Sequence, residues 1–319
     1  MSKKKLLFQK IRGERLDRFV ADEVSAVTRS QVRSLIEGEK IFVNGKVKKP
    51  SHILKRGDEI EVFVEKPRAA VAEPDSGVSF RVVAEEKDFL VIEKPADVLT
   101  HPTLTQESSS LIEGVLSKYP EIANVGEDAL RPGVVHRLDR GTSGLLVVAR
   151  TKKGFTSLKK QFQKRTVSKE YMALVYGKFK EKHGDISYSI VRSKHNPTQW
   201  VALRGADEAP QHGKGKVRTA RTEYFVKEVY GDCTLLRVVI HTGRTHQIRV
   251  HMKAISHPVI GDSVYTTRDA KRVRLPFALH RVFLHAAKLS FDDPTTNERK
   301  TFTSRLPKTL QEFLRKMES

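Results

Sequence analysis

The chain has 319 residues, and its 59 Lys and Arg outnumber its 38 Asp and Glu, which gives a formal net charge of +21. A hydrophobic content of 38% suffices for a sizeable core and excludes wholesale disorder, while one cysteine, Cys233, excludes an internal disulfide and a thiolate zinc site. No apolar run is long enough to span a membrane, and the N-terminus lacks the apolar stretch of a secretory signal. We therefore expect a cytoplasmic protein with no membrane-spanning segment and with a polyanionic partner, either nucleic acid or an anionic membrane surface.

The N-terminal part of the chain has the pattern of a small α/β module. Apolar residues at helical spacing predict a helix that starts near Leu16 and a second helix that starts at Ser30. Asn44-Gly45 between apolar residues predicts a two-residue hairpin, and alternation over 59–64 predicts a strand. Three basic residues on and around the second helix could bind phosphates, or could simply be exposed to solvent: Arg29, Arg33 and Lys46.

One stretch of the chain has the composition of a linker. Residues 67–79 are rich in proline, alanine and other small residues and show no periodicity. We therefore expect one domain over 1–66 and a second over 80–319. Within the second domain, glycines and a proline interrupt a polar stretch at 204–218, which predicts a loop.

The second domain alternates between predicted strands and helices. A helix is expected over 111–119 and another after Gly243, where the apolar period changes. Strands are expected at 80–84, 89–92, 134–135, 144–149, 171–175 and 235–240.

A charged loop separates the strands expected at 134–135 and 144–149. Within it, Asp139 lies between Arg137 and Arg140 and beside a glycine, which lets a ligand or another backbone come close. Such an aspartate can also close a turn with its own backbone. The residue pattern alone leaves both roles open.

Two other segments contain candidate site residues. Arg249 lies beside the apolar face of the helix after Gly243, where an arginine usually has an acidic partner or reaches solvent. Tyr171 shares a strand face with apolar residues and could be an ordinary core residue or could stack on a base. Three histidines fit neither one helix face nor one strand face, and no further ligands complete a set, so no metal site is expected: His241, His246 and His251.

Taken in order, these segments resemble a known family. The motifs that carry the likeness are His136-Arg137-Leu138-Asp139 with Thr142-Ser143-Gly144-Leu145, Lys169-Glu170-Tyr171, and Thr242-Gly243-Arg244-Thr245-His246-Gln247-Ile248-Arg249. Over roughly 80–315 the chain is similar to the RluA-type pseudouridine synthases, and its N-terminal module resembles an S4-like RNA-binding domain. One departure is Arg140-Gly141, where many relatives have a lysine and an acidic residue.

The resemblance implies an α+β fold, with a mixed, mostly antiparallel sheet, flanking helices and a small S4-like module before it. It implies a monomeric isomerase that converts uridine in structured RNA to pseudouridine without a cofactor or metal. The leading target is ribosomal RNA of the large subunit, and transfer RNA is the second possibility. We therefore expect the enzyme to act in rRNA processing.

The resemblance also assigns roles to residues. Asp139 would be the catalytic residue, acting as a nucleophile at ribose or uracil or as a base, Arg249 would keep it ionised, and Tyr171 would stack on the uracil. The expected RNA contacts of the second domain are Arg137, Arg140, Arg244 and His246.

Two alternatives remain at this point. A non-catalytic RNA-binding ribosome-assembly factor on the same fold would have the same charge, but it need not retain Asp139, Tyr171 and Arg249 together. A protein bound to an anionic membrane would need an exposed amphipathic helix. The closest candidate is the apolar stripe over 155–162, which is more typical of a helix that faces the core.

Overall fold

The computed structural model describes residues 2–24, 29–64, 72–103, 109–196, 198–205, 208 and 213–318. The chain divides into two compact units, Met1–Val71 and Ala72–Ser319, and each has its own hydrophobic core. Residues 65–71 of the expected boundary region lie outside the described residues. Residues 72–79 of the expected linker belong to the second unit, because the Ala72 N–H donates to the Ala129 carbonyl and the Asp75 N–H donates to the Glu113 carbonyl.

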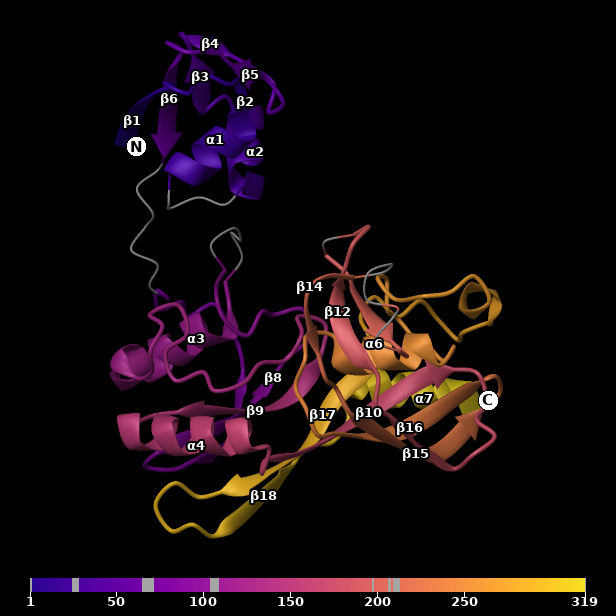
Figure 1. Ribbon diagram of the computed structural model, residues 1–319. Helices are drawn as coiled ribbons and strands as arrows, with labels where there is room; N and C mark the ends of the chain where they lie inside the picture. The colour runs from indigo at the N-terminus through magenta and orange to yellow at the C-terminus, as the bar shows by residue number, and fades with distance from the viewer. Residues whose placement is uncertain are drawn as a thin grey trace. The chain divides into compact units, whose positions relative to one another are not determined.

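The first unit combines two helices with short strands (Figure 1). Its four-stranded sheet has the order β1-β6-β3-β4, and β2 pairs with β5. The elements are β1 (Ser2–Leu7), β2 (Glu14–Arg15), α1 (Leu16–Glu23), α2 (Arg29–Glu37), β3 (Ile41–Val43), β4 (Lys46–Val47), β5 (Ile53–Leu54) and β6 (Glu59–Val64). The predicted helices and final strand are confirmed. So is the hairpin, since Asn44 and Gly45 have φ of 49° and 71° between β3 and β4.

The second unit is built around a nine-stranded sheet with the order β11-β15-β16-β10-β17-β9-β8-β7, to which β18 adds by pairing with β17. Its strands are β7 (Arg81–Glu85), β8 (Phe89–Lys94), β9 (Ser143–Ala149), β10 (Ser168–Tyr176), β11 (His183–Ile186), β12 (Ser189–Ser193), β13 (Trp200–Leu203), β14 (Gly213–Arg218), β15 (Thr222–Tyr230), β16 (Cys233–Ile240), β17 (Leu284–Asp292) and β18 (Arg299–Thr303). Its helical segments are α3 (Leu111–Lys118), η1 (Pro120–Asn124), α4 (Lys152–Lys164), α6 (Gln247–Ala254), η3 (Ala270–Arg272) and α7 (Lys308–Glu318).

The pairing of β9 with β17 is the parallel step in this otherwise antiparallel sheet. At this step the two strands approach closely beside Gly144, where φ is 114° and a Cβ would lie 2.3 Å from the Ala286 carbonyl oxygen. Only glycine fits there. The sheet is therefore mixed and mostly antiparallel, as expected. The charged loop leads into β9, one of the two strands that pair in parallel.

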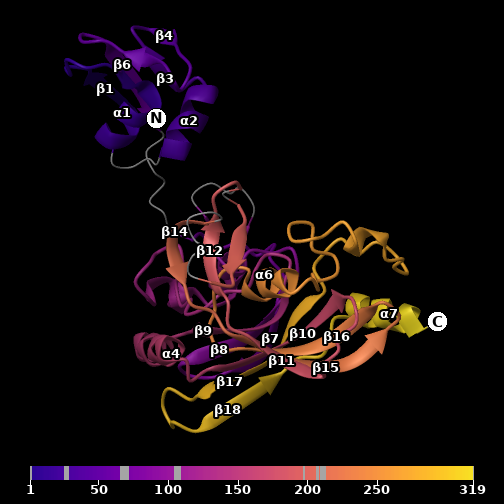
Figure 2. The same ribbon diagram turned by 45° about the vertical axis from the view of Figure 1, so that its right-hand side comes forward.

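Helices cover the sheet at both ends (Figure 1 and Figure 2). Helix α4 packs on β9 and β17, and α7 packs on β15. Leu158 of α4 is fully buried, and Phe155 and Phe162 pack against the same core. The apolar stripe therefore faces the sheet and not a lipid surface. Within the described part of the chain, we find no helix with the length and apolarity needed to cross a membrane.

Two local predictions were wrong. Val134 and Val135 do not form a strand, because a turn from Arg131 holds this segment and leaves a single bridge between Val134 and Val148. Residues 213–218, expected to be part of a loop, form β14 in a three-stranded sheet of order β13-β12-β14. The sequence did not indicate this strand because its residues are mostly polar. Pairing with β12 satisfies the backbone hydrogen bonds of β14, so the strand needs no buried apolar face.

Candidate active site

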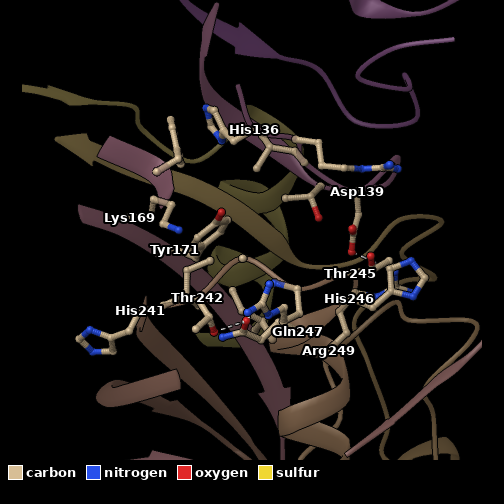
Figure 3. A pocket seen from close by; sticks show the side chains of 18 of the residues that line it. His136, Asp139, Lys169, Tyr171, His241, Thr242, Thr245, His246, Gln247 and Arg249 are labelled. Carbon is tan, nitrogen blue, oxygen red and sulfur yellow. Dashed lines mark hydrogen bonds and ion pairs between the residues drawn. The ribbon is translucent and has the colours of Figure 1, made fainter. Parts of the chain in front are cut away.

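A cavity of about 350 Å³ opens where four segments of the second unit meet (Figure 3). They are the charged loop before β9, the C-terminal end of α4, strand β10, and the connection from β16 into α6. The side chains that matter most below are Arg137, Asp139, Lys169, Tyr171, Arg244, His246 and Arg249. Elements far apart in the sequence thus form one pocket.

The buried side chain of Lys94 holds the loop that carries Asp139. Its buried Nζ donates hydrogen bonds to the carbonyls of Pro95 and Val98 (2.7 Å each) and to that of Arg140 (3.0 Å). Burial, followed by the charge of Arg281, lowers the pKa of Lys94 to about 7. Lys94 therefore joins the Asp139 loop to the segment after β8.

Asp139 is paired with Arg249. The Nη1 of Arg249 donates to Oδ2 of Asp139 at 3.2 Å, although the two residues are 110 positions apart. Helix α6 presents Arg249 to the pocket with its side chain only 9% exposed, and the Asp139 side chain is 19% exposed. Arg249 therefore makes a charge-assisted hydrogen bond to this carboxylate in a partly buried setting.

Asp262 holds Arg249 in place from the other side. Its two carboxylate oxygens accept from Nε and Nη2 of Arg249 at 2.6 and 2.9 Å, and Oδ1 also accepts from the backbone N–H groups of Val264 and Tyr265. Gly261 precedes it with φ of 76°, and a Cβ there would lie 1.9 Å from a backbone carbonyl oxygen. The tight turn and the two-pronged contact fix the guanidinium plane, so that Nη1 points at Asp139.

Electrostatics in this cluster favour a charged Asp262 and a charged Arg249. Burial raises the pKa of Asp262, but the hydrogen bonds and charge of Arg249 and two backbone amides outweigh it and lower the pKa. Burial lowers the pKa of Arg249, yet Asp262 and Asp139 raise it above its ordinary value. The guanidinium is therefore a permanent cation shared between two carboxylates.

Tyr171 and His246 line the same pocket. Burial, followed by the negative charge of Asp139, raises the pKa of Tyr171, so its phenol stays neutral. Burial is also the main cause of the lowered pKa of His246. Nδ1 of His246 lies 2.8 Å from the hydroxyl of Tyr265, which accepts from the Trp200 backbone N–H. His246 is thus a neutral ring anchored from outside the pocket.

Comparisons with known proteins agree with this architecture. The sequence pattern of the RNA pseudouridylate synthase family matches residues 88–254, and that of the S4 domain matches residues 14–60. An uncharacterized RNA pseudouridine synthase of Aquifex aeolicus is 34% identical, with 95% of this chain and 94% of the relative covered. The chain belongs to the RNA pseudouridylate synthase family.

Other relatives of this synthase have more specific names. A protein of Escherichia coli named ribosomal large subunit pseudouridine synthase D is 33% identical, over 96% of this chain and 91% of its own length. The solved structure of human RNA pseudouridylate synthase domain containing 1 is 30% identical and has a TM-score of 0.57, with 74% of this chain and 86% of that chain covered. The protein is an RNA pseudouridine synthase, an isomerase, with an S4 RNA-binding domain.

The structure brings most of the predicted site residues of the synthase together. Asp139, Tyr171 and Arg249 share the pocket with three expected RNA contacts: Arg137, Arg244 and His246. Arg140 does not line it, since its Nε donates to the Asp97 carbonyl outside the pocket. The Thr142 N–H donates to the Asp139 carbonyl and closes a turn there. Because of this turn, the side chains of Asp139 and Arg140 point in different directions.

The expected RNA contacts of the S4 module lie in the first unit. Arg33 forms an ion pair of 3.3 Å with the buried Asp17 and remains 54% exposed, and Lys46 is exposed on β4. Arg29 begins α2, and its side chain lies outside the described residues. These residues remain predicted phosphate contacts.

The three histidines have separate partners. Nε2 of His241 lies 3.1 Å from Oε1 of Glu223, His246 contacts Tyr265, and His251 contacts the Tyr188 carbonyl at 3.0 Å. The described residues contain no group of three or more His, Cys, Asp or Glu side chains that could hold a metal ion.

Sequence reasoning assigned no role to three residues that the site depends on: Asp262, Lys94 and Lys169. Each lies in a segment that belongs to the family likeness. Neither spacing nor composition indicates that Asp262 would pair with Arg249 or that Lys94 would be buried, because both depend on how distant segments pack.

Proposed function

We propose that the protein isomerises uridines in large-subunit ribosomal RNA to pseudouridine, as a cytoplasmic monomer, with Asp139 as the catalytic carboxylate. The ion pair between Asp139 and Arg249 in the pocket is the observation that supports this role most strongly. Relatives named ribosomal large subunit pseudouridine synthase D support the choice of RNA.

The reaction needs a charge that can act on the bond between ribose and base. The bond from ribose to N1 of uracil breaks, the freed uracil turns, and a bond from ribose to C5 forms. C5 then loses its proton and N1 gains one, so that the net change is an isomerisation. Asp139, paired with Arg249 at 3.2 Å, can act as nucleophile or base in this sequence. The neutral ring of Tyr171 offers a surface on which the turning uracil can stack.

The target base must leave its stack to reach this pocket, which costs a few kcal/mol. Contacts with the phosphate backbone offset that cost, and a net charge of +21 supplies many of them. Arg137 is exposed at the pocket wall beside Asp139, where it can fill the gap that the extruded base leaves in the RNA.

Mapping pseudouridines in total RNA from cells with and without this gene tests the proposal. We expect one or a few sites in large-subunit rRNA to disappear in the deletion strain and to return when the intact gene, but not an Asp139→Asn gene, is reintroduced. Loss of sites in transfer RNA alone would contradict the proposed target, and an unchanged map would contradict the proposed function.

Removal of residues 1–71 should weaken RNA binding and reduce its dependence on salt. The second unit has its own core, so it should fold without the first. For every phosphate that the S4 module neutralises, its removal should reduce the slope of log affinity against log salt by about 0.7–0.9. Filter binding of rRNA fragments at several salt concentrations measures this slope. An unchanged slope would show that the S4 module does not bind the RNA backbone.

A further inference from the structure

Three cations gather at one end of the pocket, away from Asp139. Lys169 projects from β10, Arg165 follows the last turn of α4, and Arg244 lies in the connection from β16 to α6. Figure 3 shows Lys169 beside Tyr171 and across the pocket from Asp139. The pocket thus has one end with the catalytic candidate and another end where positive charges gather.

These cations have no counter-charge among the described residues of the protein. Among the residues that the structure describes, no carboxylate lies within 4.0 Å of the side-chain nitrogens of Lys169, Arg165 or Arg244. No described acceptor takes a hydrogen bond from Nζ of Lys169, which lies beside Gly243 and 5.8 Å from the centroid of the Phe162 ring. Lys288, on the next strand, is by contrast paired with Glu170 at 3.1 Å.

The three charges also act on one another. Burial, followed by the charges of Arg165 and Arg244, lowers the pKa of Lys169 to about 8. Burial and the charges of Arg165 and Arg218 lower the pKa of Arg244. Burial, followed by the charge of Lys169, lowers the pKa of His136 to about 3. Like charges in a half-buried pocket are unfavourable in the empty protein and become favourable when an anion binds among them.

We propose that Lys169, with Arg165 and Arg244, forms a subsite for a backbone phosphate adjacent to the target uridine. The inference rests on the proposed function, because the pocket must take a uridine of RNA. The lysine supplies a point charge and the two guanidiniums supply planar donors, a combination that suits the two free oxygens of a phosphodiester. The subsite would hold the sugar while the base is detached.

This role makes a specific kinetic prediction. A phosphate far from the reacting atoms keeps its charge throughout the reaction, so the subsite binds it equally strongly in the ground and transition states. Lys169→Met should therefore raise KM for RNA about tenfold and leave kcat within about twofold. Lys169→Arg should behave like the wild type. Lys160→Met, which removes one exposed charge on α4 outside the pocket, is the matched control.

Nuclear magnetic resonance on the full chain with isotope-labelled lysine tests the subsite directly. The Lys169 signal is the one that disappears in Lys169→Arg. Uridine 5′-monophosphate or uridine 3′-monophosphate should raise the pKa of Lys169 from about 8, whereas uridine at the same concentration should not. Inorganic phosphate is the third probe, because it separates a general anion site from one that needs the nucleoside.

Each outcome has a distinct meaning. At a nucleotide concentration of about 0.1 M, charges farther than about 10 Å from Lys169 are screened, so only a nucleotide bound nearby should change its pKa. If neither nucleotide moves the Lys169 signal at concentrations up to this value, the subsite does not exist. A response to inorganic phosphate alone would also overturn the proposal, since the subsite would not belong to RNA. If the nucleotides raise the pKa but no rRNA uridine is modified, the proposed function fails and the subsite stands.

Discussion

Replacing Asp139 by asparagine should abolish the isomerisation and leave RNA binding within about threefold of the wild type. The amide keeps the size of the side chain but can act neither as a nucleophile nor as a base. Loss of such a residue should reduce the rate by at least about 10⁴-fold, or about 5 kcal/mol of transition-state stabilisation. Arg249 keeps its two-pronged contact with Asp262, so the fold should survive.

Release of tritium from C5 of uridine in RNA measures this reaction, because C5 must lose its hydrogen when the new bond forms. Asp97→Asn is the matched control. Asp97 is exposed on the neighbouring loop, and its φ of 64° is one that asparagine tolerates. We expect the control to retain most activity. If Asp139→Asn retained activity within about tenfold of the wild type, Asp139 could not be the catalytic carboxylate.

Local structure could be predicted where one short segment determines it. Helix α1, the Asn44-Gly45 hairpin and strand β9 were predicted because spacing and turn residues act within a few positions. The prediction failed where partners decide the conformation. Strand β14 is polar and forms by pairing with β12, and Val134 is apolar but held by a turn.

The site follows the same division. The sequence identified Asp139 as a candidate beside a glycine, but it could not distinguish a catalytic carboxylate from a turn residue. The ion pair with Arg249 is the observation that supports the catalytic role we propose, and an ion pair across 110 residues leaves no trace in local patterns. Before the structure, only the family resemblance predicted that Arg249 would act on Asp139. Asp262 and Lys169 remained unassigned because their roles depend on burial and on which charges the fold brings near them.

Charge in this protein works at two levels. The overall excess of +21 attracts RNA but does not choose a reaction. Inside the pocket the balance is local, with a guanidinium between two carboxylates at one end and, at the other, three cations to which the described residues offer no carboxylate. In the function we propose, Asp139 is the negative group at which the reaction occurs and Arg249 holds it in place, while a backbone phosphate binds to the three cations at the other end.

Replacing Arg249 by methionine should damage both stability and activity. It leaves the buried carboxylate of Asp262 without its cation, which should lower the free energy of unfolding by about 3–5 kcal/mol. It also removes the one ion-pair partner that the described residues give Asp139. Activity should fall by about 10²–10³-fold, the range seen when one preorganised electrostatic interaction is removed from an active site. Urea unfolding and tritium release measure the two effects.

The double variant Arg249→Met, Asp262→Asn separates these effects. An asparagine at 262 removes the unpaired buried charge and can still accept from the Val264 and Tyr265 N–H groups, so stability should return to within about 1.5 kcal/mol of the wild type. Activity should stay low, because Asp139 still lacks its arginine. Recovery of activity along with stability would instead show that Arg249 acts only by supporting the fold.

Acidity provides an independent measurement on the same pair. The folded protein lowers the pKa of Asp262 below the unfolded value of about 3.9, so its stabilising charge is present above that pH and is lost as the pH falls below it. Wild-type stability should therefore decrease in this acidic range, and the decrease should be smaller in the double variant, which has no carboxylate at 262. Equal acid sensitivity in both proteins would mean that Asp262 does not hold Arg249 through an ion pair.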